Sequence, residues 1–246
     1  MLLITFLIVL EMMVVEVQEN NMNDNTKIYK KVLNKMLKET ISSDLIYSEL
    51  ILPTIRFEPD GLIEGSSEKY LQNEFNWYKS QDLCIKNHLG IEENPIWKNC
   101  ASDDGYVNSN YGWCVFSKDN YSQFDNALNS LLKDKESRRA VIIYTRPNIH
   151  VEQCDNVHAK QDMMCTTYTD FLIRDNKLIM IVHMRSNDVW YGLRYDLAWQ
   201  QHVYNKMYDS LKEKYDDLLK GYIYWNCDSL HMYKSSVDKI KKFLDK

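Results

Sequence analysis

The chain is poor in the residues from which flexible linkers are built. It has seven glycines and four prolines among 246 residues, with no internal repeat and no low-complexity tract. Segments that stay disordered are usually poor in apolar residues, whereas 45% of this chain is hydrophobic. The composition therefore argues against small modules on linkers. It predicts one large domain with a substantial core.

An excess of basic residues is also missing. Lysine and arginine number 30 against 35 aspartates and glutamates, which gives a net charge of −5. A surface that binds nucleic acid broadly needs clustered positive charge. We therefore expect the protein to have no direct nucleic-acid partner.

Cysteine pairs typical of metal or redox sites are absent. None of the six cysteines is spaced as CxxC, and the chain has no export signal with a basic start and a small-residue cleavage site. Free thiols and a cytoplasmic location are therefore expected. His150, Cys154 and His158 could supply three zinc ligands, but a fourth ligand is out of reach. We expect no metal.

The longest apolar run lies at the N-terminus. Residues 1–17 (MLLITFLIVLEMMVVEV) are interrupted by Glu11 and Glu16, and the run is shorter than the ~20 residues that span a bilayer. A weak signal or anchor is one interpretation, and an extension ahead of the catalytic domain is the other. We expect residues 1–25 to lie outside the fold, a domain comprising residues 26–246, and no membrane partner.

Residues 163–201 organise the rest of the chain. Apolar and β-branched residues predict strands at 168–173 and 178–184, with turn residues between them. Gly192 then precedes a segment whose apolar residues recur at helical spacing. Other patterns predict helices at 28–41, 67–80 and 120–132, strands within 45–57 and at 140–144 and 223–226, and a last helix that opens at 229–233.

Three chemically active groups gather at the ends of these central elements: the thiol of Cys165, the guanidinium of Arg185 and the carboxylate of Asp196. A thiol beside a cation can ionise, and the thiolate is the nucleophilic form. An ionised carboxylate only accepts hydrogen bonds, so it suits a ring edge that carries an amino group. A helix cap is the alternative role for Asp196.

Glu74 lies among the apolar positions of the helix predicted at 67–80. Glutamate is usually exposed, so a solvated side chain is the ordinary interpretation. A half-buried Glu74 would instead act as a general acid or base whose pocket tunes proton transfer.

Several motifs together resemble the thymidylate synthase family. The run RSNDVWYGLRYD at 185–196 is similar to the family's R-S-x-D-V-x-x-G-L-x-x-N, with Asp196 in place of the final asparagine. The segments EFNWY at 74–78, NSNYG at 108–112, SRR at 137–139 and SLHMY at 229–233 resemble further family motifs. The aspartate and the RSNDV segment resemble the family's deoxycytidylate hydroxymethylase branch. The family's Arg-Thr-Gly phosphate-binding turn is missing.

The resemblance implies roles for individual residues. Cys165 would be the nucleophile that attacks a pyrimidine, with Glu74, Tyr111 and Asp196 completing the catalytic group. The nucleotide would be bound by Arg138, Arg139, Arg185, Ser186, His231 and Tyr233. The co-substrate 5,10-methylenetetrahydrofolate would be held by Trp97, Asp188 and Gly192.

The resemblance also implies a fold and a reaction. The fold would be a single α/β (α+β) domain with a large mixed sheet packed by helices, forming a homodimer through the sheet with shared active sites. The reaction would be hydroxymethylation of deoxycytidylate (dCMP) at C5. A thymidylate synthase, a hydroxymethylase acting on dUMP or CMP, and an inactive homologue that only binds nucleotide or RNA are the alternatives.

Overall fold

The computed structural model describes residues 23–41, 46–154 and 161–245. The expectations for the apolar N-terminal segment therefore lie outside the described residues. Helix α1 (Asp24–Ile41) begins inside the predicted extension. The buried Asn25 amide donates to the main-chain oxygens of Glu58, Asp60 and Gly61. This corrects the predicted boundary, because residues 23–25 belong to the fold.

The core of the molecule is a five-stranded mixed sheet with the strand order β2-β7-β5-β4-β3. Strands β5 and β7 are parallel, and the other neighbours are antiparallel. The large mixed sheet that the family resemblance predicts is therefore confirmed. Its strands are β2 (Thr54–Phe57), β3 (Ala140–Ile143), β4 (Thr166–Arg174), β5 (Lys177–Met184) and β7 (Leu219–Cys227).

Strands β4 and β5 form the hairpin that the sequence predicts. Asp175 and Asn176 adopt positive φ angles of 49° and 58°, as both central residues of a tight two-residue hairpin turn require. Along both strands buried and partly exposed residues alternate, since successive side chains point to opposite faces. One face of the sheet thus packs against the core.

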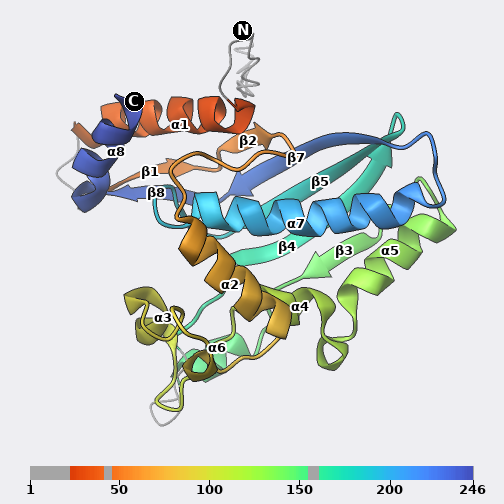
Figure 1. The fold of residues 1–246 in the computed structure, drawn as a ribbon, viewed down its shortest axis with the longest axis horizontal. Coiled ribbons are helices and arrows are strands. Elements are labelled where there is room, and N and C mark those ends of the chain that lie inside the picture. The colour runs from red at the N-terminus through yellow and green to blue at the C-terminus, as the bar shows by residue number, and fades with distance from the viewer. Residues whose placement is uncertain (1–22, 42–45, 155–160, 246) are drawn as a thin grey trace, which may run out of the picture.

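Helix α7 (Leu193–Lys212) runs across one face of the sheet (Figure 1). The crossover it provides between the parallel strands β5 and β7 is the usual one, because parallel neighbours need a long connection. The apolar residues predicted to face the core are all buried, namely Leu197, Ala198, Val203, Met207 and Leu211.

A second, three-stranded sheet has the order β1-β8-β6, with strands β1 (Tyr47–Ile51), β8 (Ser229–Tyr233) and β6 (Asn187–Asp188). The prediction that 229–233 opens the last helix is wrong. Leu230 and Met232 are buried while their neighbours are partly or fully exposed, which is the alternation of a strand. The last helix, α8 (Val237–Leu244), follows a 3-10 turn at Lys234–Ser236.

The strands predicted within 45–57 are present, but β1 pairs with β8 and β2 pairs with β7. Consecutive strands of the chain therefore enter different sheets. None of the helices formed by residues 23–41, 46–154 and 161–245 combines the length and apolar character needed to span a bilayer.

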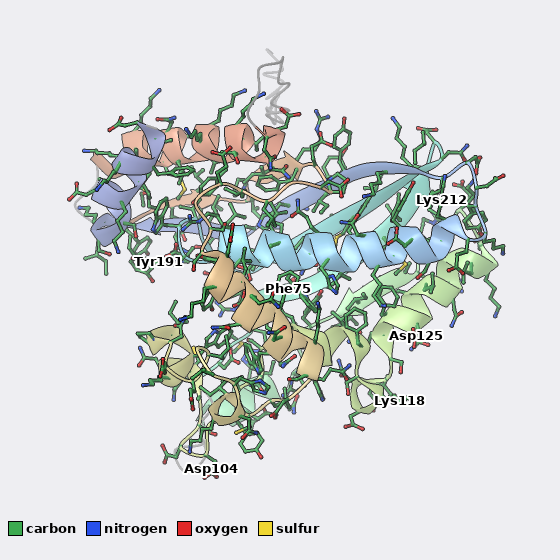
Figure 2. All side chains as sticks on the ribbon, in the orientation of Figure 1. Phe75, Asp104, Lys118, Asp125, Tyr191 and Lys212 are labelled. Atoms are coloured by element: carbon green, nitrogen blue, oxygen red, sulfur yellow. The ribbon has the colours of Figure 1, made fainter. Side chains whose placement is uncertain are left out.

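Five helices precede β4 in the chain after β2: α2 (Glu68–Ser80), α3 (Pro95–Cys100), α4 (Tyr111–Phe116), α5 (Gln123–Lys133) and α6 (Ile149–Cys154). Phe75, labelled in Figure 2, lies where α2 passes α7, with its ring centroid 5.6 Å from that of Trp199. Helices α2 and α4 approach so closely that a Cβ on Gly112 would lie 1.7 Å from the carbonyl oxygen of Tyr78. The N-terminal turn of α4 is thereby joined to the last turn of α2.

Candidate active site

The β4–β5 pairing brings Cys165 and Arg185 together. The Arg185 main-chain N–H donates to the Cys165 carbonyl at 2.9 Å. The Arg185 guanidinium Nη2 lies 3.9 Å from the Cys165 Sγ, and Nε donates to the carbonyl of Met164 at 3.0 Å. The two residues singled out in the sequence are therefore neighbours, and the guanidinium is held in place by main-chain carbonyls.

Burial opposes ionisation of this thiol. It raises the pKa of Cys165 to about 11, although the positive charge of Arg185 acts in the opposite direction. A thiol with such a pKa is protonated at neutral pH, and only the thiolate is a strong nucleophile. Burial therefore outweighs the single guanidinium of Arg185 in its effect on the pKa of Cys165.

Asp196 lies in the first turn of α7, and its carboxylate Oδ2 accepts a hydrogen bond of 2.7 Å from the Asn187 amide. Burial raises the pKa of Asp196 to about 7, and the Asn187 bond lowers it. The side-chain bond to Asn187 differs from the helix-cap role considered above. A carboxyl group with this pKa can either donate or accept at neutral pH, depending on its partner.

Gly192 lies directly beneath this pair. A Cβ at this position would be 2.9 Å from Asn187 Nδ2 and 3.2 Å from Asp196 Oδ2. The absence of a side chain at Gly192 is thus explained by the space that the Asn187–Asp196 pair occupies.

Glu74 is buried, with an exposed fraction of 5%. Its Oε1 accepts a 2.8 Å hydrogen bond from the Tyr70 hydroxyl. Burial raises the pKa of Glu74 to about 8, and the negative charge of Asp196 adds to this effect. Hydrogen bonds from Tyr70 and Tyr78 act in the opposite direction and lower the pKa. Glu74 is therefore neutral at neutral pH and can donate a proton, as a general acid must.

Tyr111 contacts both the strand that follows Cys165 and the helix that carries Glu74. Its hydroxyl oxygen accepts from the main-chain N–H of Thr166, the residue after Cys165, at 3.3 Å. Its ring stacks on that of Tyr78 with centroids 5.4 Å apart. The phenol is buried, and its hydroxyl meets the main chain at the residue that follows Cys165.

The pairing of β6 with β8 brings Ser186, which precedes β6, close to His231 and Tyr233 of β8. Ser186 Oγ lies 3.4 Å from His231 Nδ1, and the His231 and Tyr233 rings meet edge to face at 5.3 Å. Arg138 and Arg139 are exposed. Because Ala140 pairs with Phe171, they lie toward the end of β4 remote from Cys165. A single chain does not bring these arginines to the thiol.

Two of the predicted co-substrate residues have structural partners. Trp97 Nε1 donates to the Tyr70 hydroxyl at 3.0 Å, and its ring lies edge-on to Trp77 at 4.8 Å. Asp188 Oδ1 accepts the main-chain N–H groups of Trp190 and Tyr191, both at 2.7 Å. Trp97 is partly exposed, so part of this side chain is open to solvent.

Sequence reasoning missed three residues that shape the site, namely Tyr70, Asn187 and Asp162. Asp162 is a buried carboxylate whose Oδ2 accepts the main-chain N–H groups of Asn108 and Ser109 at 2.6 Å and 2.7 Å. It therefore fixes the loop that leads into Tyr111. The spacing of Tyr70 four residues before Glu74, on one helix face, is the one signal that could have found any of them.

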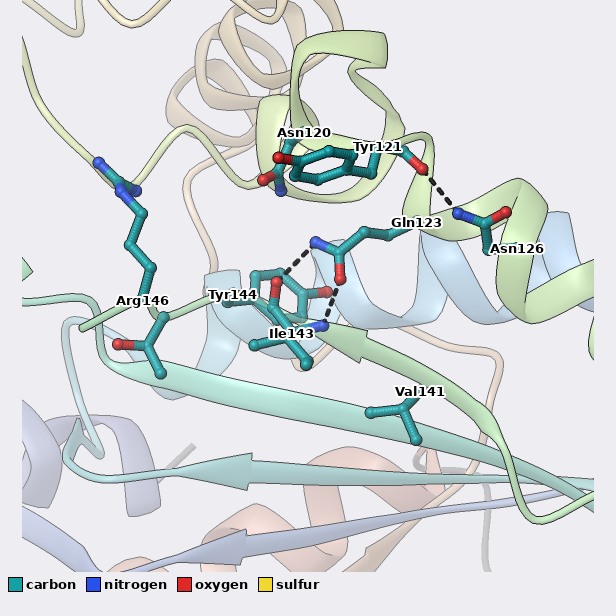
Figure 3. A pocket seen from close by; sticks show the side chains of 9 residues that line it. Asn120, Tyr121, Gln123, Asn126, Val141, Ile143, Tyr144 and Arg146 are labelled. Atoms are coloured by element: carbon teal, nitrogen blue, oxygen red, sulfur yellow. Dashed lines mark hydrogen bonds between the residues drawn. The ribbon is translucent and has the colours of Figure 1, made fainter. Parts of the chain in front are cut away.

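Two cavities are lined by residues other than the predicted site residues. One, of about 320 Å³, lies between β3 and the start of α5 (Figure 3). There the Gln123 side chain accepts from the Ile143 N–H and donates to the Ile143 carbonyl, and so occupies the open edge of β3. The other, of about 430 Å³, lies between α2 and α7 and is lined by residues such as Phe75 and His202.

Among the residues that the structure describes, no cluster of three potential metal ligands is present. The side chain of Cys154 and all of His158 lie outside that set. The zinc alternative therefore remains untested.

Comparison with known proteins agrees with the motifs. A family model described as thymidylate synthase matches residues 66–246. The deoxycytidylate 5-hydroxymethyltransferases of Enterobacteria phages T4 and T6 are 43% identical over 169 residues, which cover 68% of this chain and 68% of each relative. The thymidylate synthase of Francisella philomiragia is 22% identical over 182 residues, covering 71% of this chain and 64% of that enzyme. Since most of the chain matches the family model and the phage enzymes match over two thirds of their length, the chain belongs to the thymidylate synthase family, as its motifs predicted.

Proposed function

We propose that the protein is a deoxycytidylate 5-hydroxymethyltransferase, which transfers a one-carbon unit from 5,10-methylenetetrahydrofolate to C5 of dCMP and adds water. The observation that carries this proposal is Asp196, held by Asn187 at the position where the family's thymidylate synthases have asparagine. The 43% identity to phage enzymes of that name supports it.

Asp196 suits cytosine rather than uracil. Cytosine presents an amino donor at N4 and an unprotonated acceptor at N3. A carboxyl group with a pKa of about 7 can accept from N4 and share its proton with N3. Uracil presents an acceptor at O4 and a donor at N3, which match an asparagine amide. A site built for one pattern leaves buried groups unpaired with the other, and this discriminates strongly.

The reaction follows from the residues around the base. The Cys165 thiolate forms a bond to C6, and the electron pair moves to C5, which becomes the carbon nucleophile. Methylenetetrahydrofolate supplies the one-carbon unit that C5 attacks. Glu74 mediates proton transfer at the pyrimidine. Loss of the C5 proton breaks the bond between the transferred carbon and tetrahydrofolate, which leaves without a change of oxidation state, and the nucleotide then carries an exocyclic methylene. Water adds to this methylene as the Cys165–C6 bond breaks.

The remaining assigned residues would bind the substrates. Arg185 and Ser186 would contact the phosphate, and His231 and Tyr233 the sugar. Trp97, Asp188 and Gly192 would line the folate site. Part of the Trp97 side chain is open to solvent. Both main-chain hydrogen bonds to Asp188 are accepted by Oδ1, and Oδ2 would be the oxygen that contacts the folate.

We further infer that the protein is a homodimer joined through the large sheet, with each nucleotide phosphate bound by Arg138 and Arg139 of the other copy. The sheet face opposite α7 carries partly exposed aromatic and aliphatic side chains: Leu172, Ile179, Ile181, Tyr222 and Tyr224. Such a surface is typical of a protein interface. Two additional guanidinium groups would also lower the pKa of Cys165 and suit phosphate, which arginine contacts bidentately.

The test is the turnover of dCMP, dUMP and CMP with saturating methylenetetrahydrofolate, with product identification by mass spectrometry. Wild type is expected to prefer dCMP and to release 5-hydroxymethyl-dCMP. Asp196→Asn should shift kcat/KM from dCMP toward dUMP by roughly 10- to 100-fold, since a mismatched buried hydrogen bond costs about 1–3 kcal/mol.

Other products would identify the alternatives. Methylation of dUMP would make the protein a thymidylate synthase, the activity named by the family model and by the bacterial relative. A wild type that prefers dUMP, or a ratio unmoved by Asp196→Asn, would contradict the proposal.

A further inference from the structure

A hydrogen-bonded chain connects the helix α3 to Glu74. Trp97 Nε1 donates to the Tyr70 hydroxyl oxygen at 3.0 Å, and the Tyr70 hydroxyl in turn lies 2.8 Å from Glu74 Oε1. All three side chains are at least partly buried. The chain therefore spans the distance between the predicted folate-binding tryptophan and the predicted proton-transfer group.

The direction of this chain is set by its first member. An indole N–H can only donate, whereas a phenol hydroxyl has a single hydrogen and can also accept. Because Trp97 donates to the Tyr70 oxygen, the Tyr70 hydrogen is free to point at Glu74 Oε1. The proton of a neutral Glu74 is then directed to its other oxygen, Oε2, to which Tyr70 does not donate.

The ring of Tyr70 is fixed independently of its hydroxyl. It packs edge to face against Tyr195 with centroids 4.9 Å apart. The Tyr195 hydroxyl in turn accepts the main-chain N–H of Ser67, the residue that caps α2. The phenol oxygen is thus held between α2, α3 and the start of α7, next to Asp196.

We propose that Tyr70 is a positioning residue for proton transfer, which orients the Glu74 carboxyl group and couples it to Trp97 in the co-substrate pocket. This deepens the proposed function and rests on its assignment of Glu74 to proton transfer. Tyr70 does not touch the reacting atoms. It acts through Glu74, whose charged and titratable neighbours are Tyr70 and Tyr78 on α2 and Asp196 on α7.

The consequence for pH has a definite sign. A hydroxyl that donates to a carboxylate stabilises the ionised form, so it lowers the pKa of Glu74, and burial acts in the opposite direction. Removing the Tyr70 hydroxyl must therefore raise the pKa of Glu74. Any rate that depends on the ionisation of Glu74 will then change at a higher pH.

The experiment compares the full-length wild type with Tyr70→Phe, which removes one oxygen and keeps the ring on Tyr195. We expect kcat to fall about 10- to 100-fold, the loss typical of a hydrogen bond to a charged group, while KM for the nucleotide changes by less than about threefold. The apparent pKa of the kcat profile should move to higher pH. Trp97→Phe should move it in the same direction by a smaller amount, and the double variant should resemble Tyr70→Phe, because residues acting as a unit are not additive.

Tyr195→Phe is the matched control, since it removes a phenol hydroxyl from the same cluster without touching Glu74. It should retain the wild-type pH profile. A kcat for Tyr70→Phe equal to that of wild type, or a lower kcat with an unshifted profile in a protein of unchanged Tm, would overturn the proposal.

A second readout separates this proposal from the proposed function. Solvent exchange of the C5 hydrogen, measured with dCMP and with dUMP in the absence of folate, requires only addition of Cys165 and proton transfer. If wild type exchanges but does not hydroxymethylate dCMP, the proposed function fails. The role of Tyr70 is then still decided by the pH dependence of exchange, which must shift upward in Tyr70→Phe.

Discussion

The two walls of the site differ in how completely a single chain builds them. On the wall that faces the base, Asp196 and Glu74 each accept a hydrogen bond shorter than 3 Å, and burial raises both pKa values, to about 7 and about 8. On the phosphate wall the contacts are longer, 3.9 Å from Arg185 to Cys165 and 3.4 Å from Ser186 to His231. The groups proposed to recognise the base are thus held by short hydrogen bonds within one chain, whereas Arg138 and Arg139, which are proposed to bind the phosphate, lie far from Cys165 in the same chain.

The largest expected effect comes from replacing the thiol of Cys165, the proposed nucleophile, which lies beside Arg185. Cys165→Ser should lower kcat by roughly 10⁴-fold or more, as loss of a nucleophile does in other enzymes, because a hydroxyl is a far weaker nucleophile than a thiolate. Affinity for dCMP, measured by calorimetry, should stay within about threefold of wild type. Cys84→Ser is the matched control, since Cys84 is a partly exposed free thiol outside the site. Turnover by Cys165→Ser close to the wild-type rate would remove this residue from its role.

A smaller effect should show whether the phosphate wall is completed by a second copy. Arg138→Ala should weaken dCMP binding by about tenfold, through the loss of a charge-assisted contact to phosphate. At dCMP concentrations far below KM, where Arg138→Ala alone keeps about one tenth of wild-type turnover, mixing it with Cys165→Ser should raise the turnover, because each mixed dimer contains one site with both residues intact. After random exchange half of the dimers are mixed and each has one working site of two, so about one quarter of wild-type activity is expected. Subunit exchange demonstrated with tagged chains but without recovered turnover would show that the sites are not shared.

The smallest effect tests whether the base wall depends on its internal hydrogen bond. Asn187→Ala removes the donor to Asp196, and a charge-assisted bond contributes about 1.5–3 kcal/mol. The preference for dCMP over dUMP should fall by roughly tenfold. Because the Asn187 bond lowers the pKa of Asp196, its loss raises that pKa, and the pH at which dCMP binding weakens should move upward. Asn205→Ala is the matched control, because it removes an amide on α7 that lines the cavity between α2 and α7. It should leave the substrate preference and the pH profile unchanged. An Asn187→Ala variant with wild-type preference and pH profile would mean that Asp196 is positioned by its helix alone.

Local patterns were sufficient to predict the central elements. The hairpin turn at Asp175 and Asn176 and the apolar face of α7 follow from residues close in sequence, which is where turn chemistry and helical periodicity operate. The same spacing placed Glu74 among the apolar positions of α2, but the pattern alone favoured a solvated side chain, and only the family resemblance favoured the buried side chain that the structure shows.

Sequence patterns failed where pairing between distant segments determines the secondary structure. Residues 229–233 form the central strand of the small sheet because β1, about 180 residues earlier, and β6 supply their partners. The bond between Asn187 and Asp196 joins a two-residue strand to a helix, and the bond between Trp97 and Tyr70 joins two helices. Hydrogen bonds of this kind depend on how elements are placed in space, and a single sequence carries no periodic signal for them.

The contact at Gly112 has a consequence for directed evolution of this enzyme. A Cβ there would meet the Tyr78 carbonyl at 1.7 Å, so even alanine would force apart the helix that carries Glu74 and the helix that begins with Tyr111. Libraries that randomise residues 108–113 should therefore keep glycine at this one position. The connection between the two anchored ends, residues 81–107, includes exposed positions such as Leu89 and Tyr106. Exposed positions within that connection can therefore be substituted without moving Glu74 relative to Tyr111.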